Sequence, residues 1–465
     1  MATRREQDSL GTKRVPSGAY YGIHTLRAVE NFPISGLRLP PEMVRAYALI
    51  KKAAALTNAA LGGLEPRKAR AIARACEELL RGRFADQFVV DVYQAGAGTS
   101  FNMNVNEVLA NRANELLGAR RGTYRLVHPN DHVNMAQSTN DTFPTAIRLA
   151  CLLQLPGLLS AMTGLERALS RKARQFGRVV KAGRTHLQDA VPVTLGREFG
   201  GYALAVAKAR EHLRRAGGLL GELNLGGTAA GTGMNAHPRY RGMAIRRLRQ
   251  WTRLPLTPAE NLMERMQSQA DFARLSGAMR DYALELIRIA NDLRLMTSGP
   301  NAGLGEIALP VVQPGSSIMP GKVNPVIAEM TDMVGFQVVG HDATVMMAVQ
   351  AGQLELNVMM PVVAYNVLQP MRLLTSTSRV LAARCVAGIT ADAARCRGYA
   401  ERSLALVTAL APRIGYLAAA KIAKLSLASG KPMTQLVVEQ GGLSASEARR
   451  VLDPLVLAGL ARRRP

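Results

Sequence analysis

Aromatic side chains are scarce in this chain: they make up 5% of the 465 residues, with a single tryptophan. Proteins that bind single-stranded nucleic acids stack bases on aromatic rings, so this composition disfavours that class. Cysteine is equally rare, and the four cysteines stand far apart without a Cys-x-x-Cys pair. This usage excludes a disulfide framework and is typical of a reducing compartment. We therefore expect a cytoplasmic protein that folds without cross-links.

Acidic residues are also few. The chain has 59 Lys and Arg against 34 Asp and Glu, a formal net charge of +25, while its 48% hydrophobic and 20% charged residues are the proportions of a folded globular protein. The basic residues are dispersed; the longest runs are the tail at 462–464 and pairs such as Arg246 and Arg247. We interpret the charge as a solvated basic surface that steers small anions, and we expect no nucleic-acid partner.

Long hydrophobic runs are missing as well. The first fourteen residues, MATRREQDSLGTKR, contain no apolar core of a signal peptide. The least polar stretch, CLLQLPGLLSAMTGL after Arg148, is short and contains Pro156 and Gly157. The sequence therefore predicts neither a signal peptide nor a membrane-spanning helix.

What the chain does have is apolar residues at three- and four-residue spacing, which predicts an all-α fold. One helix is expected from Pro41 to the Gly62-Gly63 pair and another after Pro66. Three longer helices, expected over 194–224, 259–296 and 325–359, argue for a bundle. The methionines of the helix expected over 325–359 are predicted to lie in the core. Apolar residues occur on all sides of this helix, which predicts that other subunits cover it in an oligomer. The predicted domains are 1–140 (N-terminal, mostly helical), 141–395 (long-helix bundle) and 396–465 (small, helical).

Four polar segments interrupt these helices, at 94–104, 128–144, 183–192 and 313–325, each ahead of a predicted helix N-terminus. Free N–H groups at such ends attract anions, and the segments are rich in hydroxyl, amide and ammonium donors. One segment alone could be an ordinary helix cap. Together the four suit a small carboxylate substrate. The last one, with Ser316 and Lys322 between Gly315 and Pro325, is expected to be a mobile loop that closes over a ligand.

Other site signatures are weak. His128 and His132 lie four residues apart without an accompanying metal motif. The glycine-rich segment 226–235 matches neither a dinucleotide fingerprint nor a phosphate loop, and there is no Gly-x-Ser-x-Gly elbow of a hydrolase. We therefore expect no metal and no organic cofactor.

The segment GSSIMPGKVNP (315–325) resembles the signature of the fumarase/aspartase superfamily, and the other three segments match that family in the same order. The resemblance runs from about residue 20 to about residue 454. Between the motifs, NFPISG (31–36), AENL (259–262) and AGQLELNVM (351–359) are more similar to the aspartase branch than to class II fumarases.

This resemblance implies an all-helical, three-domain subunit whose long helices join those of three neighbours in a homotetramer with active sites shared between subunits. It implies a small dicarboxylate substrate and the reversible elimination of ammonia from L-aspartate to give fumarate, through an enediolate intermediate. The alternative is a class II fumarase acting on L-malate, and a second alternative is an inactive homologue acting as a cationic binding protein.

The resemblance also implies residue roles. Ser316 is expected to be the general base that removes the proton next to the β-carboxylate, in an electropositive site that makes its alkoxide accessible. His186 and Asn140 are expected to face the departing amine, with Glu329 orienting the histidine. Phe101 replaces the small residue usual in the family and could narrow the pocket. The residues expected to hold the enediolate are Thr99, Ser138, Thr139 and Thr185, and those expected to hold the α-carboxylate are Lys322 and Asn324.

Overall fold

The computed structural model describes residues 2–460, which form two compact units. Unit 1 comprises residues Met1–Leu159, Glu211–Ala283 and Phe336–Thr375, and unit 2 comprises Ser160–Arg210, Leu284–Gly335 and Ser376–Pro465. The described part of the chain is built of α-helices with four two-stranded sheets, which confirms the predicted all-α class. The prediction of three domains at 1–140, 141–395 and 396–465 stays a prediction.

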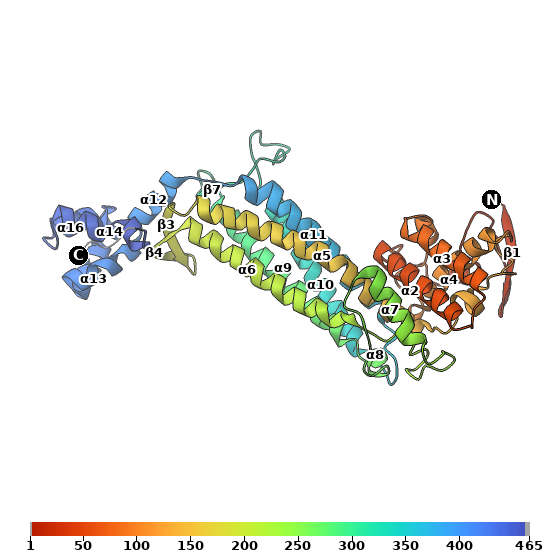
Figure 1. Ribbon diagram of the computed structural model, residues 1–465. Helices are drawn as coiled ribbons and strands as arrows, with labels where there is room; N and C mark the ends of the chain where they lie inside the picture. The colour runs from red at the N-terminus through yellow and green to blue at the C-terminus, as the bar shows by residue number, and fades with distance from the viewer. Residues whose placement is uncertain (1, 461–465) are drawn as a thin grey trace. The chain divides into compact units, whose positions relative to one another are not determined.

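Unit 1 begins with a hairpin of β1 (Thr3–Asp8) and β2 (Gly11–Pro16), followed by helices that pack on one another, α2 on α3 and α7 and α3 on α4 (Figure 1). The helix α2 begins at Pro41 and ends at Ala60, before Gly62 takes a positive φ of 81°, as predicted. Proline at a first helical position costs no hydrogen bond, since that N–H has no helical partner. The other helices of this part are α1 (Ile23–Asn31), α3 (Pro66–Leu80), α4 (Thr99–Leu116), α7 (Tyr240–Thr252) and α8 (Glu264–Gln267), with strands β5 (Glu222–Leu223) and β6 (Thr257–Pro258).

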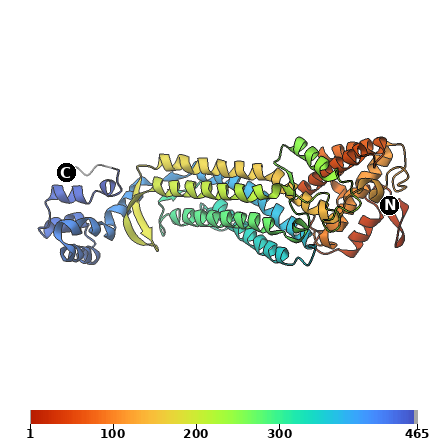
Figure 2. The same ribbon diagram turned by 60° about the horizontal axis from the view of Figure 1, so that its bottom comes forward.

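Five long helices contribute residues to both units: α5 (Thr139–Gln175), α6 (Leu195–Gly218), α9 (Ala270–Met296), α10 (Val326–Gln350) and α11 (Met360–Val380). Within unit 2, α5 and α6 lie side by side (Figure 2), and Arg210 forms a 2.9 Å ion pair with Glu166. All three predicted long helices are shorter than expected. The one predicted over 194–224 is α6, which ends at Gly218 before a short turn and β5. The helix predicted over 259–296 is broken between α8 and α9, and the one predicted over 325–359 ends at Gln350, because Asn357 turns the chain back by donating to the carbonyls of Ala348 and Val349.

The helix α5 corrects another expectation. The stretch containing Pro156 and Gly157 is not interrupted but lies inside one 37-residue helix, Thr139–Gln175. This helix is long and apolar enough to cross a membrane by length and composition, and 67% of its most apolar window is buried inside the structure. A core helix has the same character, because it too is apolar on most sides.

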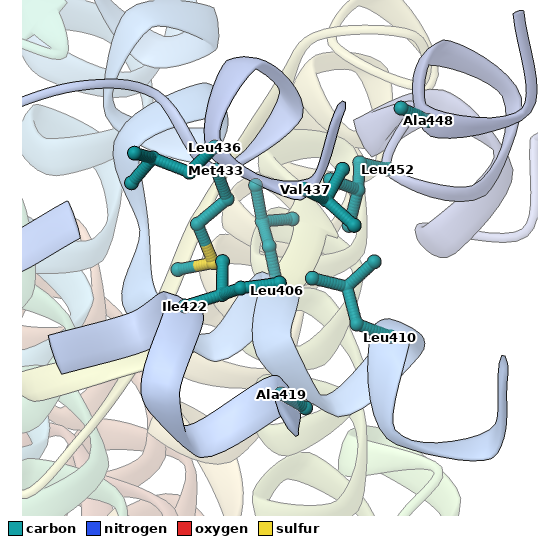
Figure 3. Close-up of a cluster of buried hydrophobic side chains, with 9 residues drawn as sticks. All are labelled: Leu406, Leu410, Ala419, Ile422, Met433, Leu436, Val437, Ala448 and Leu452. Carbon is teal, nitrogen blue, oxygen red and sulfur yellow. The ribbon is translucent and has the colours of Figure 1, made fainter. Parts of the chain in front are cut away.

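Unit 2 contains the hairpin of β3 (Val180–Thr185) and β4 (Gln188–Thr194), the pair β7 (Ile307–Ala308) and β8 (Thr390–Ala391), and a series of short helices. The short helices surround their own apolar cluster, which includes Leu410, Ile422 and Val437 (Figure 3). Gly415 and Gly430 end two of them with positive φ, 85° and 71°. The basic tail at 462–464 lies outside the described residues. The short helices are α12 (Ala393–Arg402), α13 (Val407–Ile414), α14 (Tyr416–Ser429), α15 (Met433–Glu439), α16 (Ala445–Val451) and α17 (Pro454–Leu457).

The methionines expected in the core are divided. Met360 is fully buried, but Met333, Met346 and Met347 on α10 are 66%, 48% and 65% exposed, and Met359 is 43% exposed. The prediction was therefore wrong for these four within a single chain. Helical periodicity cannot tell a core face from a face that is left open for another subunit, because both are apolar.

Candidate active site

In unit 1, the polar segment before α5 caps that helix. The Ser138 hydroxyl accepts from the backbone N–H of Asn140 at 3.1 Å, and the Asp141 carboxylate accepts from the backbone N–H of Ser138 at 2.9 Å. This reciprocal arrangement resembles a capping box with aspartate in the third helical position, except that the serine accepts from the second helical N–H and not from the third. The capping carboxylate is fully buried, and burial raises the pKa of Asp141 to about 7.

Asp141 also fixes the glycine-rich segment. Its second carboxylate oxygen accepts from the backbone N–H groups of Gly226 at 2.9 Å and Thr228 at 3.1 Å. The glycine at 226 is required there, because its φ is +90° and an added Cβ would lie 2.9 Å from the Cβ of Arg241. The segment that matched no nucleotide motif therefore serves as a wall against the N-terminus of α5.

This wall orients Asn140. The Asn140 amide Nδ2 donates to the Ala229 carbonyl at 2.9 Å. With the amino side of the amide used in this way, its Oδ1 remains as an acceptor for a ligand donor.

The first residue of α4, Thr99, lies near the same helix start. Gly98 precedes it with a φ of +83°, and an added Cβ at Gly98 would stand 2.1 Å from ring carbons of Phe143 on α5. Only glycine permits this approach, which brings the Thr99 end of α4 against the first turns of α5. Thr99, Ser138, Thr139 and Asn140, predicted from separate segments, are thus gathered in one region of unit 1.

Behind them lies a buried polar network that the sequence did not indicate. The Asn102 amide donates to the Thr139 hydroxyl at 3.1 Å and to the side-chain oxygen Oδ1 of Asn134 at 3.3 Å, and the Lys51 ammonium donates to the same Oδ1 at 2.9 Å. Lys51 is fully buried, and burial lowers its pKa to about 7. The network fixes the Thr139 hydroxyl and brings a basic group close to it.

Phe101 does not narrow a pocket. Its side chain is 2% exposed and packs edge-on against the rings of Tyr47 and Phe143, with centroids at 5.6 and 6.4 Å. Because Thr99 and Phe101 are two positions apart on α4, they point in different directions, and the larger residue fills the core of unit 1 instead.

In unit 2, the segment 183–192 precedes α6, as predicted, but β4 separates Thr185 and His186 from the start of that helix at Leu195. They form the exposed turn of the β3–β4 hairpin, where His186 and Leu187 both have positive φ, 51° and 62°. Two-residue hairpin turns of this kind usually contain glycine or asparagine, and their absence here hid the hairpin from the sequence. The positive end of a helix dipole therefore does not lie next to these two residues.

The hairpin is fixed by a buried carboxylate. Glu306 is fully buried; it accepts from Arg184 at 2.9 Å and forms an ion pair with Lys181 at 2.8 Å, while Lys181 also pairs with Glu198 at 2.9 Å. Arg184 directly precedes Thr185, and Glu306 directly precedes β7, which leads into the Ser316 loop. The charges of two carboxylates and two cations cancel, which lowers the free-energy cost of burying Glu306.

Hydrogen bonds between Gly315 and residues 322–324 join the two ends of the Ser316 loop, and we call this junction the neck of the loop. Gly315 donates its N–H to the Lys322 carbonyl at 2.9 Å and accepts from the Asn324 amide at 2.7 Å. At the tip side, the Ser316 hydroxyl oxygen accepts from the backbone N–H groups of Met319 at 3.0 Å and Ile318 at 3.3 Å. Two donors aimed at this oxygen favour its deprotonated form.

Lys322, Asn324 and Glu329 line one cavity of about 940 Å³ in unit 2, together with Arg294 and Arg395. Between residues 2 and 460, no hydrogen bond joins His186 to Glu329, and no group of three or more His, Cys, Asp or Glu side chains is arranged to hold a metal ion. The loop residues predicted to grip a carboxylate are thus brought together by the structure. Of the residues that were missed, Asp141 had a sequence signal, since it stands three residues after Ser138 as in a capping box.

A family model described as "Lyase" matches residues 11–340, and one described as "Fumarase C C-terminus" matches residues 406–459. The chain is 50% identical to an aspartate ammonia-lyase of Pseudomonas fluorescens over 454 residues, covering 97% of this chain and 95% of that protein. It is 46% identical to the aspartate ammonia-lyase of Escherichia coli K12 over 447 residues, covering 96% and 94%.

Solved structures agree. A fumarate lyase:delta crystallin from Brucella melitensis bound to cobalt matches with a TM-score of 0.95 and 52% identity, covering 98% of this chain and all of that one. A class II fumarase from Schistosoma mansoni matches with a TM-score of 0.95 and 38% identity, covering 98% and 99%. With four motifs in order, a matching lyase model over most of the chain and near full-length relatives, this chain belongs to the fumarase/aspartase family of lyases.

Proposed function

We propose that this protein is an aspartate ammonia-lyase, a carbon–nitrogen lyase that reversibly converts L-aspartate into fumarate and ammonia. The observation that carries this is near full-length identity of 46–50% to aspartate ammonia-lyases, whereas the class II fumarase structure is 38% identical. The four cysteines are buried and free, which supports a place in the reducing cytoplasm.

In the proposed reaction Ser316 removes the proton from the carbon next to the β-carboxylate. The N–H groups of Met319 and Ile318 support its alkoxide by donating to the hydroxyl oxygen. The electron pair left by the proton moves into that carboxylate and forms an enediolate. As the enediolate collapses to the carbon–carbon double bond of fumarate, the carbon–nitrogen bond breaks and ammonia leaves.

The enediolate needs fixed donors where its charge develops, each worth about 3 to 4 kcal/mol. Thr99, Ser138, Thr139 and Thr185 are proposed for this role. The Thr139 hydroxyl already accepts from Asn102, so its own proton remains available for the substrate. Donors held in this way cost no reorganisation at the moment of reaction.

Recognition of the amine is assigned to Asn140 and His186. Because Asn140 uses its Nδ2 on the Ala229 carbonyl, its Oδ1 is the atom left to accept from the substrate ammonium. Lys322 and Asn324 are proposed to hold the α-carboxylate. Glu329, which lines the same cavity, is proposed to orient the histidine of the assembled site.

A homotetramer with shared active sites is also proposed. The helix α10 exposes Phe336, Gly340, Ala343, Met347 and Gln350, which follow one another at spacings of four and three residues. Such a seam is typical of helices that pair along their length. Long helices of four subunits packed through this seam would cover it and would bring the loop of one chain to the donors of another.

The test offers L-aspartate and L-malate separately and follows fumarate by its ultraviolet absorbance. Fumarate from L-aspartate is expected, and turnover of L-malate alone would assign the protein to the fumarases. Ser316→Ala is expected to abolish turnover, while Ser317→Ala, the neighbouring exposed serine, is the matched control. Near wild-type turnover in Ser316→Ala contradicts the proposed base, and polyanion binding without any turnover supports the inactive-homologue alternative.

A further inference from the structure

The strongest charge feature outside the candidate site is on α7. Residues 226–259 contain no Asp or Glu, and six arginines lie between residues 239 and 253. Four of these arginines follow one another at spacings of seven, three and four residues. Arg246 and Arg249 lie on one face of α7, and Arg239 and Arg253 cap its two ends. We call this row the α7 arginine stripe: Arg239, Arg246, Arg249 and Arg253, all exposed.

The stripe is not neutralised by the protein. Within residues 2–460, none of its four guanidinium groups has an ion pair or a hydrogen bond from its side chain. Other arginines of the chain behave differently: Arg214 and Arg215 on α6 both bind Glu211, at 2.8 and 2.7 Å. Four neighbouring cations without counter-ions repel one another, so a partner that neutralises them gains free energy from the release of that repulsion.

The opposite face of α7 is buried. Tyr240, Ala244, Ile245 and Leu248 are at most 2% exposed, and α7 packs on α2 within unit 1 (Figure 1). A helix that binds lipid inserts its apolar face into the bilayer, and this apolar face is already occupied. The geometry therefore favours a water-soluble polyanion over a membrane.

The stripe is linear. The helix with its two capping arginines spans about 21 Å from Arg239 to Arg253, enough to face several successive phosphates of an extended chain. Guanidinium groups bind phosphate oxygens through paired hydrogen bonds and are never deprotonated near neutral pH.

We propose that the α7 arginine stripe binds the phosphate backbone of single-stranded nucleic acid without regard to base sequence. Composition alone argued against such a partner, because aromatic rings for base stacking are few and the basic residues are dispersed along the chain as a whole. Contacts to phosphates need no aromatic ring, so only the second reason bears on the stripe. The fold changes this, since one helix places four of them in a row and leaves them unpaired. The binding is separate from the proposed lyase reaction, whose residues the stripe does not include.

The test measures binding of a fluorescent single-stranded RNA of about 20 nucleotides to the full-length protein by anisotropy, from about 50 to 200 mM salt. Arg246→Gln with Arg249→Gln is expected to weaken binding at least tenfold at low salt. It should also reduce the slope of log affinity against log salt by about 1.4, because each single-strand phosphate contact contributes about 0.7.

The matched control is Arg214→Gln with Arg215→Gln, which removes the same charge from arginines that are already paired. Equal losses in the two double variants would mean that net charge alone attracts RNA, and would overturn the proposal, as would failure of the wild-type protein to bind at low salt. Inorganic polyphosphate is the second probe: if it binds through the stripe and RNA does not, the nucleic-acid assignment is wrong.

Turnover of L-aspartate is measured on every variant and is expected to stay at the wild-type level, which also shows that each variant is folded. Should the double variant not fold, Arg249→Gln alone is expected to lower the salt slope by about 0.7. Loss of RNA binding with unchanged turnover supports the stripe whether or not L-aspartate proves to be the preferred substrate.

Discussion

The side-chain amide of Asn224 donates a hydrogen bond of 3.3 Å to the backbone carbonyl of Asn140. That carbonyl lies four residues before Pro144, which has no N–H to give it. Asn224 is fully buried and also accepts from the Thr145 hydroxyl at 3.2 Å. A side chain distant in sequence thus replaces the backbone bond that the proline removes, at the residue proposed to bind the amine.

We expect Asn224→Ala to lower the free energy of unfolding by about 2 kcal/mol, because it leaves buried polar groups without partners. Pro144→Ala supplies a backbone N–H and should recover part of this loss in the double variant, a coupling of about 1 kcal/mol. Urea denaturation followed by the fluorescence of Trp251, which lies in unit 1, measures all four proteins of the cycle. Strictly additive effects would show that the two residues do not act on the same carbonyl.

The neck of the Ser316 loop depends on Gly315. An added Cβ would lie 2.4 Å from the Lys322 carbonyl oxygen and 2.7 Å from the Asn324 nitrogen. Gly315→Ala should open the neck and displace Ser316, lowering kcat/KM about a hundredfold, while the exposed loop contributes little to stability.

The control for Gly315→Ala is Gly157→Ala, inside α5, where nothing lies within 4 Å of the added Cβ. It should leave activity unchanged and stabilise the helix by up to about 1 kcal/mol. Steady-state kinetics and thermal unfolding of both variants decide between a local effect on the loop and a general effect of added methyl groups. Full activity of Gly315→Ala would show that the neck can widen without cost.

Glu306 is expected to position the Thr185 and His186 turn. Glu306→Gln leaves Arg184 without its buried counter-charge and should destabilise this part of unit 2 by about 3 kcal/mol. Hydrogen exchange of residues 180–185, measured by mass spectrometry, should become faster. Glu285→Gln, which removes an exposed partner of Arg288 in the same unit, should change it little. Unchanged exchange in Glu306→Gln would mean that strand pairing alone holds the hairpin.

The ion pair of Glu78 and Arg112 predicts a pH dependence in unit 1. Two hydrogen bonds of 2.7 and 2.9 Å from Arg112 hold the pKa of Glu78 below its usual value. Because the folded pKa is lowered, the stabilisation is complete above about pH 4.5 and is lost as the pH falls through the folded pKa. Glu78→Gln should cost about 2 kcal/mol at neutral pH and progressively less in acid.

Urea denaturation at neutral pH and in acid, again followed by Trp251, measures this difference. Glu77→Gln is the neighbouring control, since Glu77 is 41% exposed and its pair with Lys52 should contribute less than about 1 kcal/mol. A pH-independent cost of Glu78→Gln would assign its effect to packing and not to charge.

Several elements were determined by local sequence. Pro41 and the glycines after Ala60 fix the ends of α2, and glycines at 415 and 430 end two helices of unit 2, because backbone conformation at proline and glycine depends little on distant residues. The residues of the four polar segments were likewise sufficient to identify the family. The roles of Ser316, His186 and the binding residues remain predictions that the proposed variants test.

Other features were decided only by the tertiary structure. The β3–β4 turn has no glycine or asparagine to reveal it, and it is held by Glu306, more than a hundred residues away. The contacts of Asp141 with Gly226 and of Asn224 with Asn140 also join distant segments. Sequence spacing predicts which residues share one face of a helix. It does not predict which face stays exposed to solvent or which charged side chains form ion pairs. Those outcomes depend on contacts between distant segments, and they decided that α7 carries four unpaired arginines.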